Sequence, residues 1–463
     1  MFSMQANHLR KSNWWAFFAQ QLLINMVIRP WRPPCIKGTG RPPEAQFILC
    51  AMNDSGYQSN LRLLRGFLDE FRSVLRQESP GLIPRLAFHY VRAFLSLLCQ
   101  YPNKKLASLS LYRWINFFIM GNVMTIFWTM FVALPESKNV IEMGDDLVWI
   151  SGMALVFTKI VYMHLRCDEI DELIWHFDYY NRELRPHHTD EEVLGWQRLC
   201  YVIESGLYIN CFCLVNFFSA AIFLQPLLGE GKLPFHCVYP FQWHRLDLHP
   251  YSFWFLYIWQ SVTSQHNLMS ILMVDMVGIT AFLQTALNLK LLCIEMRRLG
   301  EMKVSDERFH EEFCRVVRFH QHIIMLVEKA NRAFNGAFNA QLMASFSLIS
   351  ISTFETMAAA AVDPKMAAKF VLLMLVAFIQ LSLWCVTGTL VYTQSVEVAQ
   401  AAFDINDWHT KSPAIQKDIS FVILRAQKPL MYVAEPFLPF TLGTYMLVLK
   451  NCYRLLALMQ ESM

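Results

Sequence analysis

Seven long apolar stretches constrain this chain more than any other feature. They cover residues 113–135, 142–163, 199–225, 251–276, 335–361, 366–394 and 437–460. At a rise of 1.5 Å per residue, each is long enough as an α-helix to cross about 30 Å of hydrocarbon. Only 17% of the 463 residues are charged and 55% are hydrophobic, whereas about a quarter of a typical soluble protein is charged. The sequence therefore predicts an all-α membrane protein with seven transmembrane helices.

The basic residues of the connecting segments predict the orientation of these helices. They are frequent before the first stretch and in every second connection after it. The alternate connections and the C-terminal end hold only Lys138, Lys232, Arg245, Lys365, Lys369 and Arg454. Because basic connections remain in the cytoplasm, we expect the N-terminus inside the cell and the C-terminus outside. The sequon at Asn53 would then lie on the cytoplasmic side and be unglycosylated.

The first 85 residues differ in composition from the rest of the chain. Residues 29–43 are rich in Pro and Arg, and the apolar start lacks the small-residue cleavage site of a signal peptide. We expect the apolar start to be an interfacial amphipathic helix or unstructured. Residues 1–85 as a whole are expected to be a poorly ordered N-terminal extension or an artefact of the gene model. The remainder divides into residues 86–290 with spans one to four, 291–435 with spans five and six, and 436–463 with the terminal helix.

Several charged residues lie within the apolar stretches, among them Lys159, Asp275 and Glu355. Lys159 and Asp275 fall near the ends of their spans, where a long side chain reaches water or the helix extends past the bilayer. Glu355 lies within its span and is the better candidate for a functional role. A buried carboxylate held by hydrogen bonds is the more common explanation of such a residue.

Catalytic, metal-binding and nucleic-acid-binding patterns are missing from the sequence. It contains no G-x-S-x-G, P-loop or H-E-x-x-H motif, and its twelve cysteines form no C-x-x-C pair. His164, His176, His187 and His188 lie among acidic residues in one cytoplasmic connection, which favours a solvated face over a metal site. The basic residues follow membrane topology and not an aromatic-laced patch. We therefore expect no enzyme activity, no cofactor, no metal and no nucleic-acid partner.

The terminal segment is divided by Pro436 and Pro439 into a lead-in half, residues 413–435, and a final helix. At 100° per residue, one face of the final helix is nearly uncharged. It carries Thr441, Tyr445, Val448, Cys452, Leu455 and Met459, whereas Lys450 and Arg454 lie on the far side. This pattern fits a pore wall, and it also fits a terminal helix packed in a bundle.

Four motifs resemble those of the insect odorant receptors. The segment GKLPFHCVYPFQW at residues 231–243, followed by His249-Pro250-Tyr251, is similar to their second outer loop. Span six resembles theirs at Cys385, Gly388, Ser395, Ala399 and Trp408, and the sequence Arg425-Ala426-Gln427-Lys428-Pro429 and Tyr453 of the last helix add to the match. The resemblance extends from Leu86 to Met459.

This resemblance implies an odorant-binding subunit that joins a shared co-receptor in a four-subunit, nonselective cation channel. It also implies a multi-pass protein of the cell membrane, in the dendrite of a sensory neuron. The inner parts of spans four to six and residues 413–435 would form a cytoplasmic anchor, and the last helix would line the pore. The family places the gate near Leu456. Together with the uncharged face, the pore and gate candidates are Thr441, Val448, Leu455, Leu456 and Met459.

The resemblance further implies a pocket for a small volatile in the outer half of spans two, three, four and six. Those spans offer Trp149, Met153, Phe217, Phe218, Ala221, Phe255, Ile258, Phe370, Leu373 and Phe378. Such a pocket binds by apolar burial. Because none of these residues is charged, amines and acids are disfavoured as ligands. Ordinary packing between helices explains each of the aromatic residues equally well.

Three other classes remain open from the sequence. A gustatory receptor has the same topology and forms a homomeric channel, but its terminal motif is matched only by Thr444-Tyr445, with no Gln-Phe after it. A G-protein-coupled receptor requires the N-terminus outside. A transporter commonly has internal repeats, and none is found.

Overall fold

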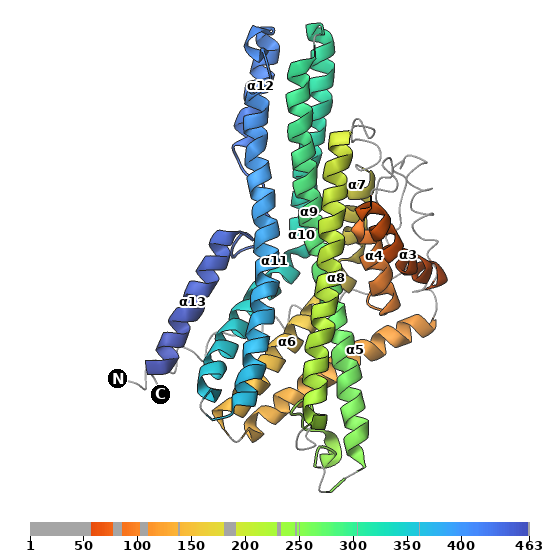
Figure 1. Ribbon diagram of the computed structural model, residues 1–463, viewed down its shortest axis with the longest axis vertical. Helices are drawn as coiled ribbons and strands as arrows, with labels where there is room; N and C mark the ends of the chain where they lie inside the picture. The colour runs from red at the N-terminus through yellow and green to blue at the C-terminus, as the bar shows by residue number, and fades with distance from the viewer. Residues whose placement is uncertain are drawn as a thin grey trace, which may run out of the picture. The chain divides into compact units, whose positions relative to one another are not determined.

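The computed structural model of the chain describes residues 57–76, 86–101, 110–137, 139–179, 191–228, 233–245, 248–249, 251–302, 304–360 and 362–461. Eleven α-helices make up most of these ranges (Figure 1). They are α3 (Tyr57–Leu75), α4 (Ala87–Leu97), α5 (Ser110–Ala133), α6 (Val140–Leu165), α7 (Cys167–Tyr179), α8 (Glu191–Leu228), α9 (Ser252–Glu301), α10 (Asp306–Ala359), α11 (Pro364–Phe403), α12 (Pro413–Ala426) and α13 (Leu442–Glu461). The prediction of an all-α membrane protein is confirmed. Asn53 lies outside the described residues.

Six of the described helices are long and apolar enough to cross a membrane, namely α5, α6, α8, α9, α10 and α11. Each contains or closely overlaps one of the first six predicted stretches. The seventh stretch is also helical, as α13, but this helix does not reach the same apolarity because Lys450, Asn451 and Arg454 lie within its 20 residues. A helix that is polar on one side is less suited to being surrounded by lipid than to packing against protein or water.

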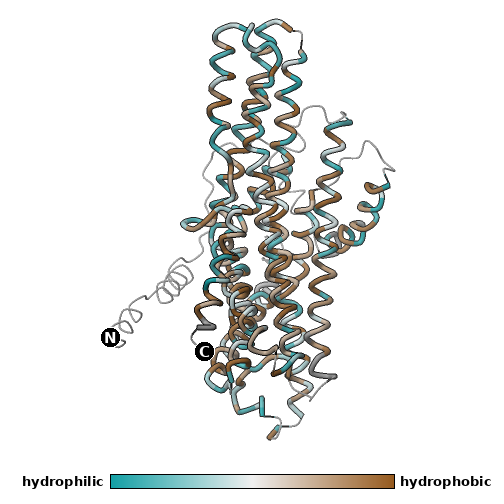
Figure 2. Tube along the Cα trace, turned by 60° about the vertical axis from the view of Figure 1, so that its left-hand side comes forward, coloured by the Kyte–Doolittle hydropathy of each residue, from teal (hydrophilic) through white to brown (hydrophobic). Residues whose placement is uncertain are grey.

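Helices α9, α10 and α11 continue well past the apolar stretches that predicted them. At 50 residues, α9 is about 75 Å long, against about 30 Å of hydrocarbon. Figures 1 and 2 show α9, α10 and α11 extending beyond α8, with α12 beside α11 and more hydrophilic residues in this part. The apolar stretches end where charged residues begin. The helices continue beyond these points, because charged residues are compatible with helical periodicity and capping. The first turn of α10, for example, is capped by Ser305, whose hydroxyl accepts from the Arg308 amide.

Helix α9 is the centre of the fold, and almost every side chain from Met269 to Met296 is buried. It packs against α4, α6, α8, α10 and α11. Asp275, in the middle of α9, forms an ion pair with Lys159 of α6, and their side chains are 5% and 1% exposed. The expectation that both residues reach water at span ends is therefore wrong. Each charge is buried and is compensated by the other, as a charge in a low-dielectric interior requires.

Part of the predicted N-terminal extension is a packed helix. The apolar face of α3 lies on α4 and α8, where Phe67 contacts Tyr90 at 4.8 Å between ring centroids. The following helix α4 is joined to α7 by an ion pair between Arg92 and Asp171 at 3.5 Å. The expectation of a solvated face for the histidines of this region also fails for His176, which lies against the His322 ring at 5.4 Å. His187 and His188 are outside the described residues.

Candidate functional site

A cavity of about 180 Å³ lies between helices α6, α8, α9 and α11. Its wall is mostly apolar and is completed by Met130 of α5, Leu348 of α10 and Phe235 of the segment before α9. The contributions of α8 and α9 include Leu214, Phe218, Leu268, Ile271, Leu272 and Ile279. A concave, mostly apolar space with few polar groups is typical of a site for a small organic molecule.

Four of the ten predicted pocket residues line this cavity, namely Trp149, Met153, Phe218 and Leu373. Phe370 is fully buried one turn from Leu373, in a separate cluster with Val148 and Ala359. Phe217, Ala221, Phe255 and Ile258 are exposed on the outside of the bundle, and Phe378 is partly buried but does not line the cavity. Adjacent residues of a helix point 100° apart, so Phe217 must face outward where Phe218 faces inward.

The contribution of α9 lies deeper along the helix than the sequence suggested. Asn267, Leu268, Ile271, Leu272 and Asp275 line the cavity, about two and a half to five and a half turns beyond Ile258 and Phe255. Their spacing of three and four residues is the signal that could have identified them. Depth along a helix of this length depends on its neighbours, which the sequence alone does not give.

A short segment closes one end of the cavity. The backbone of Phe235 is held by Gln260, whose side chain accepts from the Phe235 amide at 3.0 Å and donates to its carbonyl at 3.1 Å. The Phe235 ring packs edge-on against Trp149 at 4.6 Å between centroids. Further along, the Val238 amide donates to the Thr129 carbonyl at 3.1 Å. We call residues 233–243 the lid, because Phe235 forms part of the cavity wall and the segment is fastened to α5, α6 and α9.

An ionic contact fastens the lid to the start of α6. His236 Nδ1 lies 2.9 Å from Asp146 Oδ2, and the Ser137 hydroxyl donates to the same oxygen at 2.7 Å. The hydrogen bond that His236 donates to Asp146 raises the pKa of His236 above its ordinary value. The negative charge of Asp146 and, more weakly, those of Glu136 and Glu142 act in the same direction. The contact is thus strengthened when His236 is protonated.

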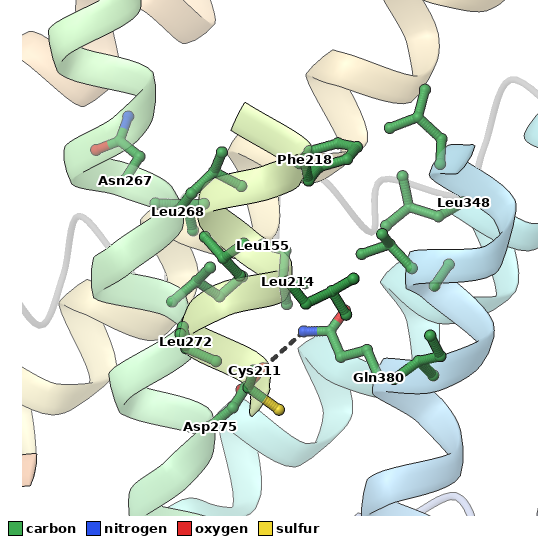
Figure 3. A pocket seen from close by; sticks show the side chains of 18 of the residues that line it. Leu155, Cys211, Leu214, Phe218, Asn267, Leu268, Leu272, Asp275, Leu348 and Gln380 are labelled. Atoms are coloured by element: carbon green, nitrogen blue, oxygen red, sulfur yellow. Dashed lines mark hydrogen bonds between the residues drawn. The ribbon is translucent and has the colours of Figure 1, made fainter. Parts of the chain in front are cut away.

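A polar network lies at the other end of the cavity from Phe218 (Figure 3). Gln380 Nε2 donates to Asp275 Oδ2 at 2.6 Å, and Lys159 donates to the second oxygen of Asp275 and to Gln341. Asp275 and Gln380 both line the cavity. The predicted set of pocket residues contained no charge, whereas the wall contains this carboxylate. Because Asp275 is neutralised by Lys159, the wall carries no net charge at this point.

Glu355 lies outside the cavity, at the interface of α10 with α6. It is 2% exposed and fills the space that a side chain at Gly144 would take, since a Cβ there would lie 1.9 Å from its Oε1. Its Oε2 has no hydrogen-bond partner among the described residues. The hydrogen bond expected for this carboxylate is therefore not found at Oε2 among the described residues.

The uncharged face of α13 packs inside the chain. Val448 and Cys452 are 8% and 5% exposed, and the Cys452 thiol donates to the Phe346 carbonyl of α10 at 3.8 Å. Leu442, Met446, Tyr453, Lys450 and Arg454 are exposed on the other side of the helix. Val448 is therefore buried within the single chain, and a pore wall at this face stays a prediction. The Met459 side chain is outside the described residues.

Leu455 and Leu456 differ in their position relative to this packed face. Both are half-buried. By helical phase Leu455 follows Val448 and Cys452 on the side of α10, while Leu456 lies beside Leu442 and Tyr453 at the edge of the exposed side. Thr441 precedes α13, and its hydroxyl accepts from the Thr444 amide at 3.3 Å. Leu456 therefore lies nearer to the exposed side of α13 than Leu455 does.

Comparisons with known proteins agree with the fold. A family model described as 7tm Odorant receptor matches residues 139–453. Odorant receptor 47b of Drosophila melanogaster is 93% identical over 412 residues, which cover 89% of this chain and 100% of that protein. Odorant receptor 65a of the same species is 32% identical over 352 residues, covering 75% and 84%.

A solved structure has the same fold at low identity. The insect olfactory receptor OR5 from Machilis hrabei, in complex with eugenol, superposes with a TM-score of 0.68 at 12% identity, over 86% of this chain and 100% of that one. The same receptor without that title ligand gives a TM-score of 0.67 at 14% identity.

Proposed function

The chain belongs to the insect odorant receptor family, and from this premise we propose that it binds a small volatile and gates a cation channel formed with a shared co-receptor. The observation that carries the proposal is the apolar cavity between α6, α8, α9 and α11. Burial in such a cavity contributes about 25 cal/mol per Å² of apolar ligand surface. The ligand is an uncharged, mainly apolar molecule, because the one carboxylate of the wall is already neutralised by Lys159.

The proposed assembly places α13 at the pore and the inner parts of α9 to α12 at the contacts between subunits. Two exposed residues of α12 support the proposed contacts between subunits. Phe421 and Leu424 are 69% and 66% exposed, on a helix that lies beyond the apolar spans. Exposed large apolar residues of this kind mark protein contacts. The basic connections place this end in the cytoplasm and the lid outside.

The experiment that tests the function is co-expression in a heterologous cell. The chain with an insect co-receptor, the chain alone and the co-receptor alone are each exposed to a panel of volatiles, and whole-cell current is recorded. We expect at least one volatile to evoke a cation current only when both subunits are present. A panel-wide absence of current with both subunits at the surface contradicts the proposal.

Leu456 is expected to contribute to the closed gate. Truncation of Leu456 to alanine removes apolar volume from the edge of the exposed side of α13, so the resting current of the co-receptor complex should increase. A Leu456→Cys variant should react with a methanethiosulfonate reagent, and faster when an activating volatile is present. The measurement is current before and after the reagent.

Leu455→Cys is the matched control, because Leu455 lies on the side that packs against α10. It should react more slowly than Leu456→Cys in the same complex. The native Cys452 gives little background, since it is 5% exposed. Equal rates at both positions, or no modification at Leu456, would remove Leu456 from the proposed gate.

The contact between His236 and Asp146 should make ligand release depend on external pH. Because the pKa of His236 is raised in the folded protein, the stabilisation is fully present below about pH 6.5 and is lost as pH rises through the raised pKa. After washout of a volatile, current should therefore decay more slowly near pH 6 than near pH 8. The side chain of His236 is 40% exposed, so the effect should not exceed about fivefold, the equivalent of a surface ion pair of about 1 kcal/mol.

His236→Gln tests the assignment, because glutamine can still donate to Asp146 but does not titrate. We expect the decay rate of this variant to be independent of pH over the same range. His249→Gln is the control, because His249 is exposed in the same connection. This variant leaves the contact between His236 and Asp146 unchanged. If His236→Gln retains the wild-type pH dependence, the lid contact is not its source.

A further inference from the structure

Trp384 of α11 is part of the cavity wall and also of a cluster of aromatic rings next to α13. It lines the cavity and is 3% exposed. Its ring also packs against Phe440 at 5.4 Å between centroids, and against Phe282 and Phe338 at 5.5 Å each. Phe440 is 1% exposed and lies two residues before the start of α13 at Leu442. A single side chain therefore joins the cavity wall to the start of the terminal helix.

The backbone of α11 is fastened to the same segment one turn further on. A Cβ at Gly388 would lie 2.1 Å from the Phe440 carbonyl oxygen, so the two backbones are in direct contact. The Leu442 amide, at the first turn of α13, donates to the Thr389 hydroxyl at 2.9 Å. Because close-packed interiors transmit displacements and do not absorb them, a shift of α11 at this level also shifts the start of α13.

The Trp384 ring has little freedom to move except towards the cavity. On the α9 side it occupies the space left by Gly278, where a Cβ would lie 2.3 Å from the ring. Lys159 lies 5.8 Å from its ring centroid. Its indole Nε1 has no hydrogen-bond partner among the described residues. A buried donor without an acceptor is costly, so the position of this ring is sensitive to what occupies the adjacent cavity.

We propose that Trp384 is the positioning residue that transmits occupancy of the cavity to α13 through Phe440. This inference rests on the proposed function of a ligand-gated channel. A ligand that binds more tightly when the ring is displaced shifts the population towards the corresponding arrangement of Phe440 and α13. Trp384 then sets the closed-to-open equilibrium even without ligand, which a residue that only contacts the ligand does not do.

The test is a double-mutant cycle on the ligand-free gating equilibrium. Trp384→Leu, Phe440→Leu and the double variant are placed in the Leu456→Cys background, with the co-receptor. The readouts are resting cation current per surface receptor and the rate of methanethiosulfonate modification without volatile. We expect each single variant to change the modification rate at least about fivefold, and the double variant to differ from the product of the singles, because the two rings act through one contact.

Two further variants separate this role from a general effect on folding. Trp384→Phe keeps a ring against Phe440 and should restore most of the wild-type rate. Phe177→Leu alters a buried aromatic that packs on Phe88 at 5.4 Å and lies apart from the cavity and α13, so it should leave the rate unchanged. If Trp384→Leu does not reach the surface, Trp384→Met, which also lacks a ring, forms the same cycle with Phe440→Leu.

The outcomes distinguish this inference from the proposed function. If the wild-type complex carries no cation current, the proposed function fails and the inference with it. If the wild-type complex conducts, but the Trp384 and Phe440 variants gate like the wild type or combine as independent effects, the inference alone is overturned.

Discussion

Replacement of Lys159 by methionine should lower the free energy of unfolding of the receptor by about 3–5 kcal/mol, the usual cost of leaving one member of a buried ion pair without its partner. Lys159 is fully buried and donates to both Asp275 and Gln341. In the variant, Asp275 remains as a buried carboxylate with Gln380 as its remaining hydrogen-bond donor. The measurement is the fraction of monodisperse protein after heating in detergent.

Two matched variants show whether the charge is responsible. The double variant Lys159→Met with Asp275→Leu removes both charges and should recover much of the loss, since buried pairs are often replaceable by apolar residues. Arg166→Ala breaks the pair with Glu169, whose side chains are 42% and 45% exposed, and should cost no more than about 1 kcal/mol. Wild-type stability of Lys159→Met would contradict a charged, paired Asp275.

Gly388→Ala should strongly reduce the maximal current of the complex. The added methyl group would lie 2.1 Å from the carbonyl oxygen of Phe440, which is backbone and cannot rotate away as a side chain can. Relief requires α11 and the segment before α13 to separate, and overpacking of this kind costs about 1–3 kcal/mol or more. The readout is maximal current normalised to surface receptor, as measured by surface biotinylation.

Gly206→Ala on α8 is the control for the intrinsic effect of alanine in a helix, because nothing lies within 4 Å of a Cβ at that position. It should behave as the wild type or fold slightly better, since alanine favours the helix. Normal current from Gly388→Ala at normal surface levels would show that the contact between α11 and Phe440 can loosen without effect.

The helices of this fold could be predicted from the sequence because the bilayer imposes a length and an apolarity on each span. Their extensions beyond the membrane could not, because the apolar signal ends while the hydrogen-bonded helix continues, as in α9 after residue 276. The pairing of Lys159 with Asp275 was also beyond reach. The two residues are 116 positions apart, and only the packing of α6 on α9 brings them together.

The residues of the candidate site could likewise be predicted only in part from the sequence. Helical periodicity shows that Phe217 and Phe218 point in different directions. It does not show which of the two faces inward until one residue of the helix has been located in three dimensions. The spacing of 100° per residue identified an uncharged face of α13 through Val448 and Cys452. Periodicity does not tell whether such a face meets a pore or the same subunit. In the structure this face is buried within the chain, where Cys452 packs on α10.

The central claim is that this chain contributes directly to a ligand-gated channel. The most direct test records from a membrane patch excised from cells that express the chain with an insect co-receptor, in solutions without nucleotides. An activating volatile from the whole-cell panel is applied to the outer face. The account predicts that the volatile still evokes a cation current in the excised patch, and that Leu456→Ala alters its resting level. A response that is present in the intact cell but lost on excision would contradict the account, because it would require a soluble messenger between receptor and channel.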